Sequence, residues 1–202
     1  MDRLESKTVF LDVGGVLLTN GWDHTIRRKA AQQFHLNFEE MDALHQFIFN
    51  VYEIGKITLD QYLDFVVFNQ PRKFDHQQFK EFMYAQSAEL PDTLQWLIKW
   101  KKLTRQRIIS INNEGKELNN YRVAKFRLRD CFDAFVSSCD VGMRKPDPGI
   151  FLMALGVAQA KAEDCIYFDD RPMVVAAAAT LGIQAFQHKG FENTKNILEN
   201  LK

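Results

Sequence analysis

Short apolar runs alternate with amphipathic stretches over the second half of the chain, and this alternation constrains the fold more than any other feature. Four runs have the length and flanking residues of buried strands: 107–112, 134–137, 165–168 and 183–186. Stretches with helical periodicity lie between them: 93–102, 116–126, 148–155 and 172–181, with a terminal helix after the last strand. We expect the helix at 148–155 to end at Gly156 and the helix at 172–181 to end at Gly182. This alternation predicts an α/β fold with a parallel sheet covered by helices on both faces.

The first part of the chain has a different pattern of apolar residues. It opens with one more predicted strand, Thr8–Val13, and from about Gly21 to Leu90 only helical periods follow. One apolar stripe there has a spacing of three and four residues: Leu44, Phe47, Ile48, Val51 and Ile54. Two segments have the form of a capping box: Thr58-x-x-Gln61 and Asp75-x-x-Gln78. We therefore predict a core of residues 1–18 and 88–202 and a small α-helical cap, residues 19–87, inserted into it.

Polar residues follow the ends of several predicted strands. They are Asp12, Asn112 and Asn113, Arg144 and Lys145 just beyond a strand, and Asp169 and Asp170. Ligands bind at the carboxyl ends of the strands in sheets of this kind. Three acids converging there would repel one another unless a cation lies between them. Lys145 supplies one positive charge, and carboxylates with a backbone carbonyl suit Mg²⁺ as a second.

This combination predicts an anion site in which a free carboxylate is placed for in-line attack on phosphorus. Gly14 and Gly15 follow Asp12 directly and let the backbone approach a ligand closely. Each residue also has a simpler interpretation when it is taken alone. Asp12 could cap a turn, either asparagine could form an Asx-turn or a helix N-cap, Lys145 could be a solvated loop charge, and the aspartate pair could begin a helix. Their common position at strand ends favours the site.

The chain resembles the haloacid dehalogenase (HAD) superfamily over essentially its whole length. LDVGGVL is similar to the nucleophile motif of that family, Ile111-Asn112-Asn113 to the second motif, VGMRKPDPGIF to the lysine motif and YFDDRP to the acidic fourth motif. The helical stretch between the first two motifs is similar to the inserted α-helical cap, on a Rossmann-like core. The G-x-V after Asp12, YEIGKIT and GMRKP look most like the glucose-1-phosphatase-like branch.

The resemblance implies a role for each matching residue. Asp12 would be the nucleophile that carries an aspartyl-phosphate, Lys145 would neutralise it, and Asn112 would donate to a phosphate oxygen. Mg²⁺ would bind directly to Asp170, with Asp169 one water away. The implied sets are catalytic Asp12, Lys145 and Asn112; substrate-binding Asn113 and Gly15; and metal-binding Asp12, the Gly14 carbonyl, Asp169 and Asp170.

Three positions depart from the family pattern. Phosphatases of the family usually have a second aspartate, a general acid and base, where this chain has Gly14. They usually have Ser or Thr at Asn112, for which Ser110 is a rival on the same strand face, and often Asn or Asp at Val174. Losing general acid–base help costs about 10²–10⁴ in rate, or roughly 3–5 kcal/mol of barrier. An anomeric sugar phosphate tolerates that loss better than an alkyl phosphate, and Asp23 or His24 could supply another acid.

Composition limits the other function classes. The 26 basic and 26 acidic residues cancel, which argues against nucleic acid as a partner. No apolar run approaches the roughly 18 residues of a membrane span, and MDRLESK does not have the form of a signal peptide. Three scattered cysteines suit neither a disulfide framework nor a metal cluster, so we expect a reducing cytoplasm. The oligomeric expectation is a monomer or a homodimer.

The favoured function is a Mg²⁺-dependent phosphatase that acts on a small phosphorylated metabolite such as a sugar phosphate. One alternative keeps Asp12 as nucleophile but breaks a carbon–halogen or carbon–phosphorus bond. The retained Asp169-Asp170 pair argues against dehalogenation, and the helical stretch shows no obvious cap lysine for phosphonate chemistry, although Lys56 is untested. A second alternative is a HAD-like binding or regulatory protein, which the three departures from the family pattern favour.

Overall fold

The computed structural model describes residues 7–200, and its centre is a parallel sheet of five strands. The strands are β1 (Thr8–Leu11), β2 (Ile108–Asn112), β3 (Ala134–Ser137), β4 (Cys165–Asp169) and β5 (Gln184–Gln187). Their order is β3-β2-β1-β4-β5, and every neighbouring pair is parallel. The α/β prediction is confirmed, and each predicted strand forms with its ends displaced by at most two residues. The signal-peptide prediction falls on residues 1–6, outside the described range.

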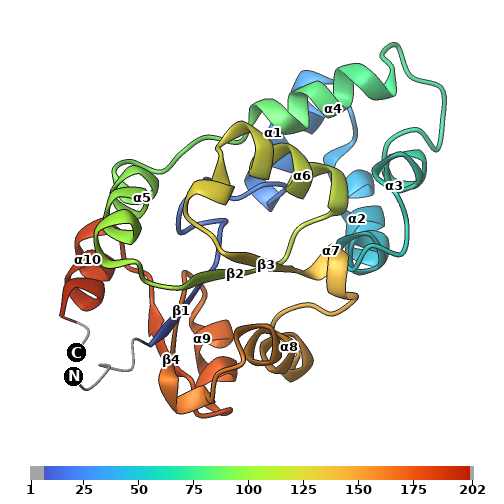
Figure 1. Cartoon of the computed structure of the whole chain (residues 1–202). Coiled ribbons are helices and arrows are strands. Elements are labelled where there is room, and N and C mark those ends of the chain that lie inside the picture. The colour runs from blue at the N-terminus through green and yellow to red at the C-terminus, as the bar shows by residue number, and fades with distance from the viewer. Residues whose placement is uncertain (1–6, 201–202) are drawn as a thin grey trace, which may run out of the picture.

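Helices cover both faces of the sheet because successive strand side chains point to opposite sides. Val9 and Leu11 join one apolar cluster with α5 (Thr93–Thr104), α6 (Lys116–Lys125) and α10 (Phe191–Glu199), whereas Phe10 joins another with α8 (Pro148–Ala158) and α9 (Pro172–Ala179). Figure 1 shows α5 and α10 on one side of the strands and α8 and α9 on the other. Three short helical segments complete the core: α7 (Ser138–Val141), η1 (Leu128–Asp130) and η2 (Ala162–Asp164).

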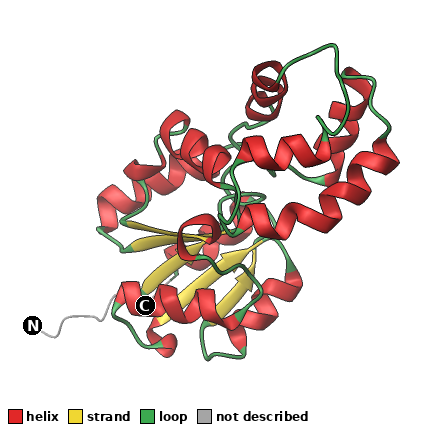
Figure 2. Cartoon of the chain, turned by 90° about the vertical axis from the view of Figure 1, so that its right-hand side faces the viewer, coloured by secondary structure: helices red, strands yellow, loops and turns green. Residues whose placement is uncertain are grey.

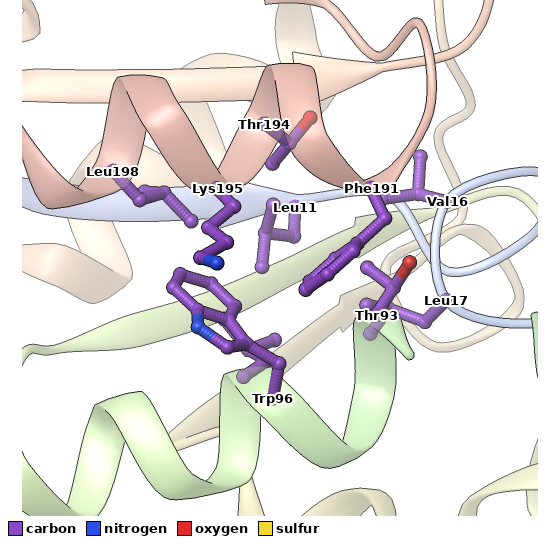
Figure 3. A pocket seen from close by; sticks show the side chains of 10 residues that line it. Leu11, Val16, Leu17, Thr93, Trp96, Phe191, Thr194, Lys195 and Leu198 are labelled. Carbon is purple, nitrogen blue, oxygen red and sulfur yellow. The ribbon is translucent and has the colours of Figure 1, made fainter. Parts of the chain in front are cut away.

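The packing between α5, α10 and the sheet is close. Figure 3 shows Trp96 and Phe191 lining a small cavity at this seam, and their ring centroids are 5.9 Å apart. The cavity has a volume of about 10 Å³, room for about one water molecule. It is therefore a packing seam and has no room for a substrate.

Two predicted helix ends are wrong. Helix α8 passes through Gly156 and ends at Ala158, and Gln159 follows with φ +49°. Gly156 keeps an ordinary helical backbone, so the left-handed residue after the helix sets the end and the glycine does not. Helix α9 ends at Ala179, two residues before the predicted position, although Gly182 with φ +85° follows as expected.

Between β1 and α5 lie four helices, which we call the helical bundle: α1 (His24–Gln33), α2 (Phe38–Glu53), α3 (Leu59–Val66) and α4 (His76–Ala85). Figures 1 and 2 show them beyond one end of the strands, and their buried side chains form an apolar cluster of their own. Both predicted capping boxes are present, at the starts of α3 and α4. The exact division of the chain into core and cap stays a prediction.

The predicted apolar stripe on α2 is wrong at one position. Phe47 is 76% exposed and stacks on Phe65, while the buried members of this helix are Met41, His45, Tyr52 and Glu53. The buried imidazole of His45 is hydrogen-bonded to the Tyr62 hydroxyl at 2.8 Å, so a polar residue takes a core position. Among residues 7–200, no helix is both long and apolar enough to span a membrane.

Candidate active site

The carboxyl ends of the central strands bring the predicted polar residues together. Asp12 directly follows β1, Asn112 ends β2 and Asp169 ends β4, and β1 pairs with both other strands. The chain crosses from one side of β1 to the other between these strands, the point where open α/β sheets bind ligands. The three residues are far apart in the sequence, but parallel pairing places the carboxyl ends of their strands at one edge of the sheet.

Lys145 lies between two of the aspartates. Its side chain is buried, with Nζ 2.9 Å from Oδ2 of Asp12 and 2.6 Å from Oδ2 of Asp169. Asn113 holds the backbone of this lysine at both polar groups: its amide nitrogen donates to the Lys145 carbonyl at 2.9 Å, and its oxygen accepts from the Lys145 amide at 2.8 Å. The side chain that we predicted to bind substrate thus positions the lysine.

Asp169 is fully occupied by donors within the protein. Besides Lys145, the Tyr167 hydroxyl donates to Oδ2 and the Arg171 backbone amide donates to Oδ1 at 2.9 Å. Burial alone would raise the pKa of this carboxyl, but the charge and hydrogen bond of Lys145 outweigh it and hold the pKa well below its usual range. Asp169 is therefore ionised, and it anchors Lys145.

Burial and nearby charges shift the pKa of Asp12 in the opposite direction from that of Asp169. Its Oδ1 accepts from the Val13 amide at 2.7 Å and its Oδ2 faces Lys145. Burial raises the pKa of Asp12 to about 6, against the charge of Lys145. An additional cation would favour the ionised form that a nucleophile needs.

Asp12, Asp169 and Asp170 form a group that could hold such a cation, because one carboxylate oxygen of each lies within 4.8 Å of the others. Gly15 makes the close approach possible: its φ is +72°, and a Cβ there would lie 2.3 Å from Oδ2 of Asp170. Only glycine fits this position without strain. The donor set is that of a hard divalent cation, so the residues fit a magnesium ion. The Gly14 carbonyl as a fourth ligand stays a prediction.

Asn112 is drawn into a buried hydrogen-bond network. Its amide nitrogen donates to Oδ1 of Asn119 at 3.0 Å, and its oxygen accepts from the Ser137 hydroxyl at 2.9 Å. The rival residue Ser110 is also fully buried and lies 3.4 Å from the same oxygen. Sequence reasoning did not identify Asn119 or Ser137, since neither belongs to a motif. Donation from Asn112 to a phosphate stays a prediction, and the second N–H of its amide would have to make it, since the first is used by Asn119.

A cleft of about 380 Å³ opens in front of Asp12. Residues from the sheet edge line it: Asp12, Gly14, Asn113, Asp170 and Arg171. The segment after β1 and the helical bundle contribute Asn20, Gly21, Trp22, Asp23, Arg27, Phe49 and Glu53, and three further charged residues complete it: Glu114, Arg122 and Arg144. Most charged members of this lining escaped the sequence analysis because they carry no motif.

A buried ion pair lies beside Gly14, where the family acid is missing. A Cβ at position 14 would be 3.2 Å from Oδ1 of Asn20 and 3.9 Å from Nη1 of Arg122, and the φ of Gly14 is not left-handed. Arg122 pairs with Glu114 and donates to the Thr19 carbonyl. A Cβ at position 14 therefore needs the Asn20 side chain to move by a few tenths of an ångström, and it would lie next to a guanidinium.

The two substitute acids named from the sequence are placed differently. Asp23 lines the cleft, but its carboxylate accepts from the Ile26 amide at 2.8 Å and caps α1. His24 is exposed, packs edge-to-face against Phe38 and does not line the cleft. Neither is a free acid in front of Asp12.

Comparison with known proteins identifies the class. The family model of the haloacid dehalogenase-like hydrolases matches residues 6–182. The chain therefore belongs to the haloacid dehalogenase-like hydrolases, which confirms the resemblance inferred from its motifs. The more specific likeness to the glucose-1-phosphatase-like branch stays a prediction.

Two characterised proteins share significant sequence. The chain is 31% identical over 119 residues to the bifunctional epoxide hydrolase 2 of Mus musculus, covering 57% of this chain and 21% of that protein. It is 28% identical over 167 residues to flavin mononucleotide hydrolase 1 of Arabidopsis thaliana, covering 80% of this chain and 63% of that protein. The chain thus spans less than two thirds of the length of either relative.

A HAD family enzyme from Bacteroides thetaiotaomicron has the same fold. At 22% sequence identity its structure superposes with a TM-score of 0.81 over 96% of this chain and 98% of that one. The same enzyme has been crystallised with magnesium and inorganic phosphate, and that structure gives a TM-score of 0.77 over 91% of this chain and 94% of that one. At this identity the likeness demonstrates the shared fold.

Proposed function

We propose that this protein is a Mg²⁺-dependent phosphatase that hydrolyses a small phosphorylated metabolite through an aspartyl-phosphate on Asp12. The observation that carries the proposal is the buried triad of Asp12, Lys145 and Asp169, with Asp170 beside it, at the base of a cleft. Magnesium and phosphate bound to the Bacteroides enzyme and the phosphate ester in the name of the Arabidopsis hydrolase support it.

Each side chain has a task in this reaction. Asp12 attacks phosphorus in line with the leaving oxygen, while the Val13 amide holds one of its oxygens. Lys145 neutralises Asp12 and the transferred phosphoryl group, and Asp169 holds Lys145 in place. Asp12, Asp170 and, through a water, Asp169 would hold Mg²⁺, which supplies Lewis-acid stabilisation of the phosphoryl oxygens.

The cleft fits a small metabolite, since about 380 Å³ lies near the lower end of ligand pockets. We propose a sugar phosphate with an anomeric leaving oxygen, because position 14 supplies no proton donor and an anomeric oxygen depends less on a donor than an alkyl oxygen does. The helical bundle acts as the family cap and selects the metabolite. We also keep the cytoplasmic location and a monomeric or homodimeric state as part of this proposal.

A regulatory binding protein is the second candidate, and the engagement of Asn112 by Asn119 and Ser137 favours it. Val174 is buried and offers no hydrogen bond to the acidic loop either. Phosphonate chemistry has less support, since Lys56 is exposed and does not line the cleft.

Turnover of p-nitrophenyl phosphate and a panel of sugar phosphates with Mg²⁺ tests the proposal. Asp12→Asn should abolish turnover and beryllofluoride binding while keeping the circular dichroism spectrum, because it removes the nucleophile but preserves its shape. Asp164→Asn, at the opposite end of β4, is the matched control and should behave as wild type. Retained turnover in Asp12→Asn excludes covalent catalysis, and an inactive wild type favours the binding protein.

Calorimetry tests the metal assignment separately. Asp170→Asn should weaken Mg²⁺ binding, since it removes the carboxylate that has the fewest protein donors of the group. An unchanged Mg²⁺ affinity would show that Asp170 is not a ligand.

A further inference from the structure

Glu53 is a buried carboxyl group in the lining of the cleft that neither the motifs nor the proposed function uses. It is the last residue of α2, is 6% exposed and lines the cleft together with Asp12, Gly14 and Asp170. The Ser138 hydroxyl donates to its backbone carbonyl at 2.7 Å, and the same hydroxyl accepts from the Glu114 amide at 3.0 Å. The core thus fixes the backbone of Glu53 at the edge of the cleft.

The carboxylate has an unusual contact for a buried group. Its Oε2 lies 2.6 Å from Nε of Arg144, yet neither atom makes a hydrogen bond with the residues described. Arg144 also donates to the side chain of Asn50 on α2 and directly precedes Lys145. A buried carboxylate held by charge alone, without directed hydrogen bonds, is costly and can release or accept a proton.

Some of the charges around Glu53 raise its pKa and others lower it. Burial raises its pKa to about 7, with Glu114 adding to the rise, while Arg144, Arg171 and Lys145 oppose it. These four groups come from the loops after β2, β3 and β4. A carboxyl group that titrates near neutral pH suits proton transfer in both directions.

We propose that Glu53 replaces the acid missing at position 14 and is the general acid and base of the phosphatase reaction. This inference rests on the proposed function, and it adds a catalytic residue that comes from the helical bundle. Another buried acid in the lining, Glu114, is a poorer candidate because Arg122 is hydrogen-bonded to its carboxylate. Asp23 is committed to capping α1.

The proton balance closes over the two half-reactions. Asp12 forms a bond to phosphorus, the bond from phosphorus to the leaving oxygen breaks, and that oxygen takes the proton of Glu53. The Glu53 carboxylate then takes a proton from a water whose oxygen attacks phosphorus. The bond between phosphorus and Asp12 breaks, phosphate leaves, and both carboxyl groups return to their starting states.

A series of phosphate esters with leaving groups of different acidity tests this role. In Glu53→Gln, kcat/KM for ethyl phosphate and glucose 1-phosphate should fall about 10²-fold or more, while kcat/KM for p-nitrophenyl phosphate changes little, because kcat/KM reports formation of the aspartyl-phosphate and the p-nitrophenolate leaving group needs no proton. Glu39→Gln, an exposed residue on the same helix, is the matched control. Introducing Gly14→Asp into Glu53→Gln should restore hydrolysis of the poor leaving groups.

The pH profile provides a readout that a purely structural role would not move. Wild-type kcat for glucose 1-phosphate should fall above about pH 7, and the decline should be absent in Glu53→Gln. Arg144→Gln should shift the decline to higher pH, because Arg144 lowers the pKa of Glu53. Equal loss of kcat/KM on all esters, or none on any, would overturn the assignment of Glu53.

The outcomes separate the two proposals. If wild type hydrolyses p-nitrophenyl phosphate and Asp12→Asn does not, the phosphatase proposal stands, and the Glu53 variants alone decide this inference. If wild type hydrolyses none of the esters, both proposals fail.

Discussion

The sheet edge and the helical bundle line the same cleft, but they are built on different principles. At the sheet edge, Asp12, Lys145 and Asp169 are almost fully buried and hold one another by direct ion pairs. The helical bundle contributes Phe49 and Glu53 from α2, where no motif marks them. The difference indicates that the predicted catalytic residues are encoded locally at strand ends, whereas the proposed proton donor, Glu53, is positioned only by tertiary packing.

Removing the central charge of the sheet edge should have the largest effect. Lys145→Met keeps the length of the side chain but leaves Asp12 and Asp169 without their shared partner. Breaking a buried ion pair in this way costs about 3–5 kcal/mol of unfolding free energy, and we expect turnover to be lost as well. Urea unfolding measures the stability, with Lys99→Met on the surface of α5 as the control. A loss below about 1 kcal/mol would show that the sheet edge does not depend on this lysine.

Glu53→Gln probes the helical bundle by the same urea unfolding measurement. Here the change in stability depends on pH, because the pKa of Glu53 differs between the folded and the unfolded protein. Burial raises the pKa of Glu53 from an ordinary value of 4.5 to about 7, so between these pH values the folded protein binds more protons than the unfolded chain. The contribution of Glu53 to stability is therefore complete below about pH 4.5 and is lost as pH rises through 7, by about 3 kcal/mol.

Replacing this carboxyl by an amide should remove the dependence. The stability of Glu53→Gln relative to wild type should rise by about 2–3 kcal/mol between pH 4.5 and pH 8 in urea unfolding. Glu39→Gln should show no such change. A constant difference across this range would mean that Glu53 is not a strained buried acid, and its role as a proton donor would lose its physical basis.

The sequence predicted the sheet edge well because each of its residues follows a strand that is recognisable by itself. Asp12, Lys145 and Asp169 do meet as expected, and the parallel pairing of the strands follows from the strand–helix alternation. The tasks of Asn112 and Asn113 were less accessible, since they depend on Asn119 and on the Lys145 backbone, which are distant in sequence or lack a motif. Glu53 could not be identified at all: the sequence shows one acid among many on a helix, and only packing buries it.

Gly15 gives a sharper test of the sheet edge, because Gly142 provides a matched control. Its φ is nearly the same, but a Cβ there would contact no heavy atom. Gly15→Ala introduces strain at φ +72° and places a Cβ 2.3 Å from Oδ2 of Asp170, whereas Gly142→Ala has the same strain at φ +69° with no heavy atom within 4 Å. Each should lose about 1–2 kcal/mol of stability. Calorimetry should show weaker Mg²⁺ binding for Gly15→Ala alone. Equal Mg²⁺ affinities in the two variants would show that Gly15 is not needed for the metal site.

The smallest effects on stability should come from the two capping boxes of the helical bundle. The two boxes differ in whether the core provides an additional hydrogen-bond acceptor. At α4, Asp75 and Gln78 cap the helix reciprocally, at 2.8 and 3.0 Å, without help from the core. At α3, Thr58 and Gln61 form the same box, but the carboxylate of Glu117 on α6 also accepts from the Leu59 amide at 2.9 Å.

Because the core provides a second acceptor at α3, Thr58→Ala should cost less than Asp75→Ala, for which we expect about 1 kcal/mol. Neither variant should alter kcat, since both positions lie outside the lining of the cleft. In a Glu117→Ala background, which removes the second acceptor, the cost of Thr58→Ala should rise toward that of Asp75→Ala, while the cost of Asp75→Ala stays constant. Additive effects of Thr58→Ala and Glu117→Ala would instead mean that the two acceptors at the start of α3 act independently, so that the contact with α6 does not compensate for loss of the Thr58 cap.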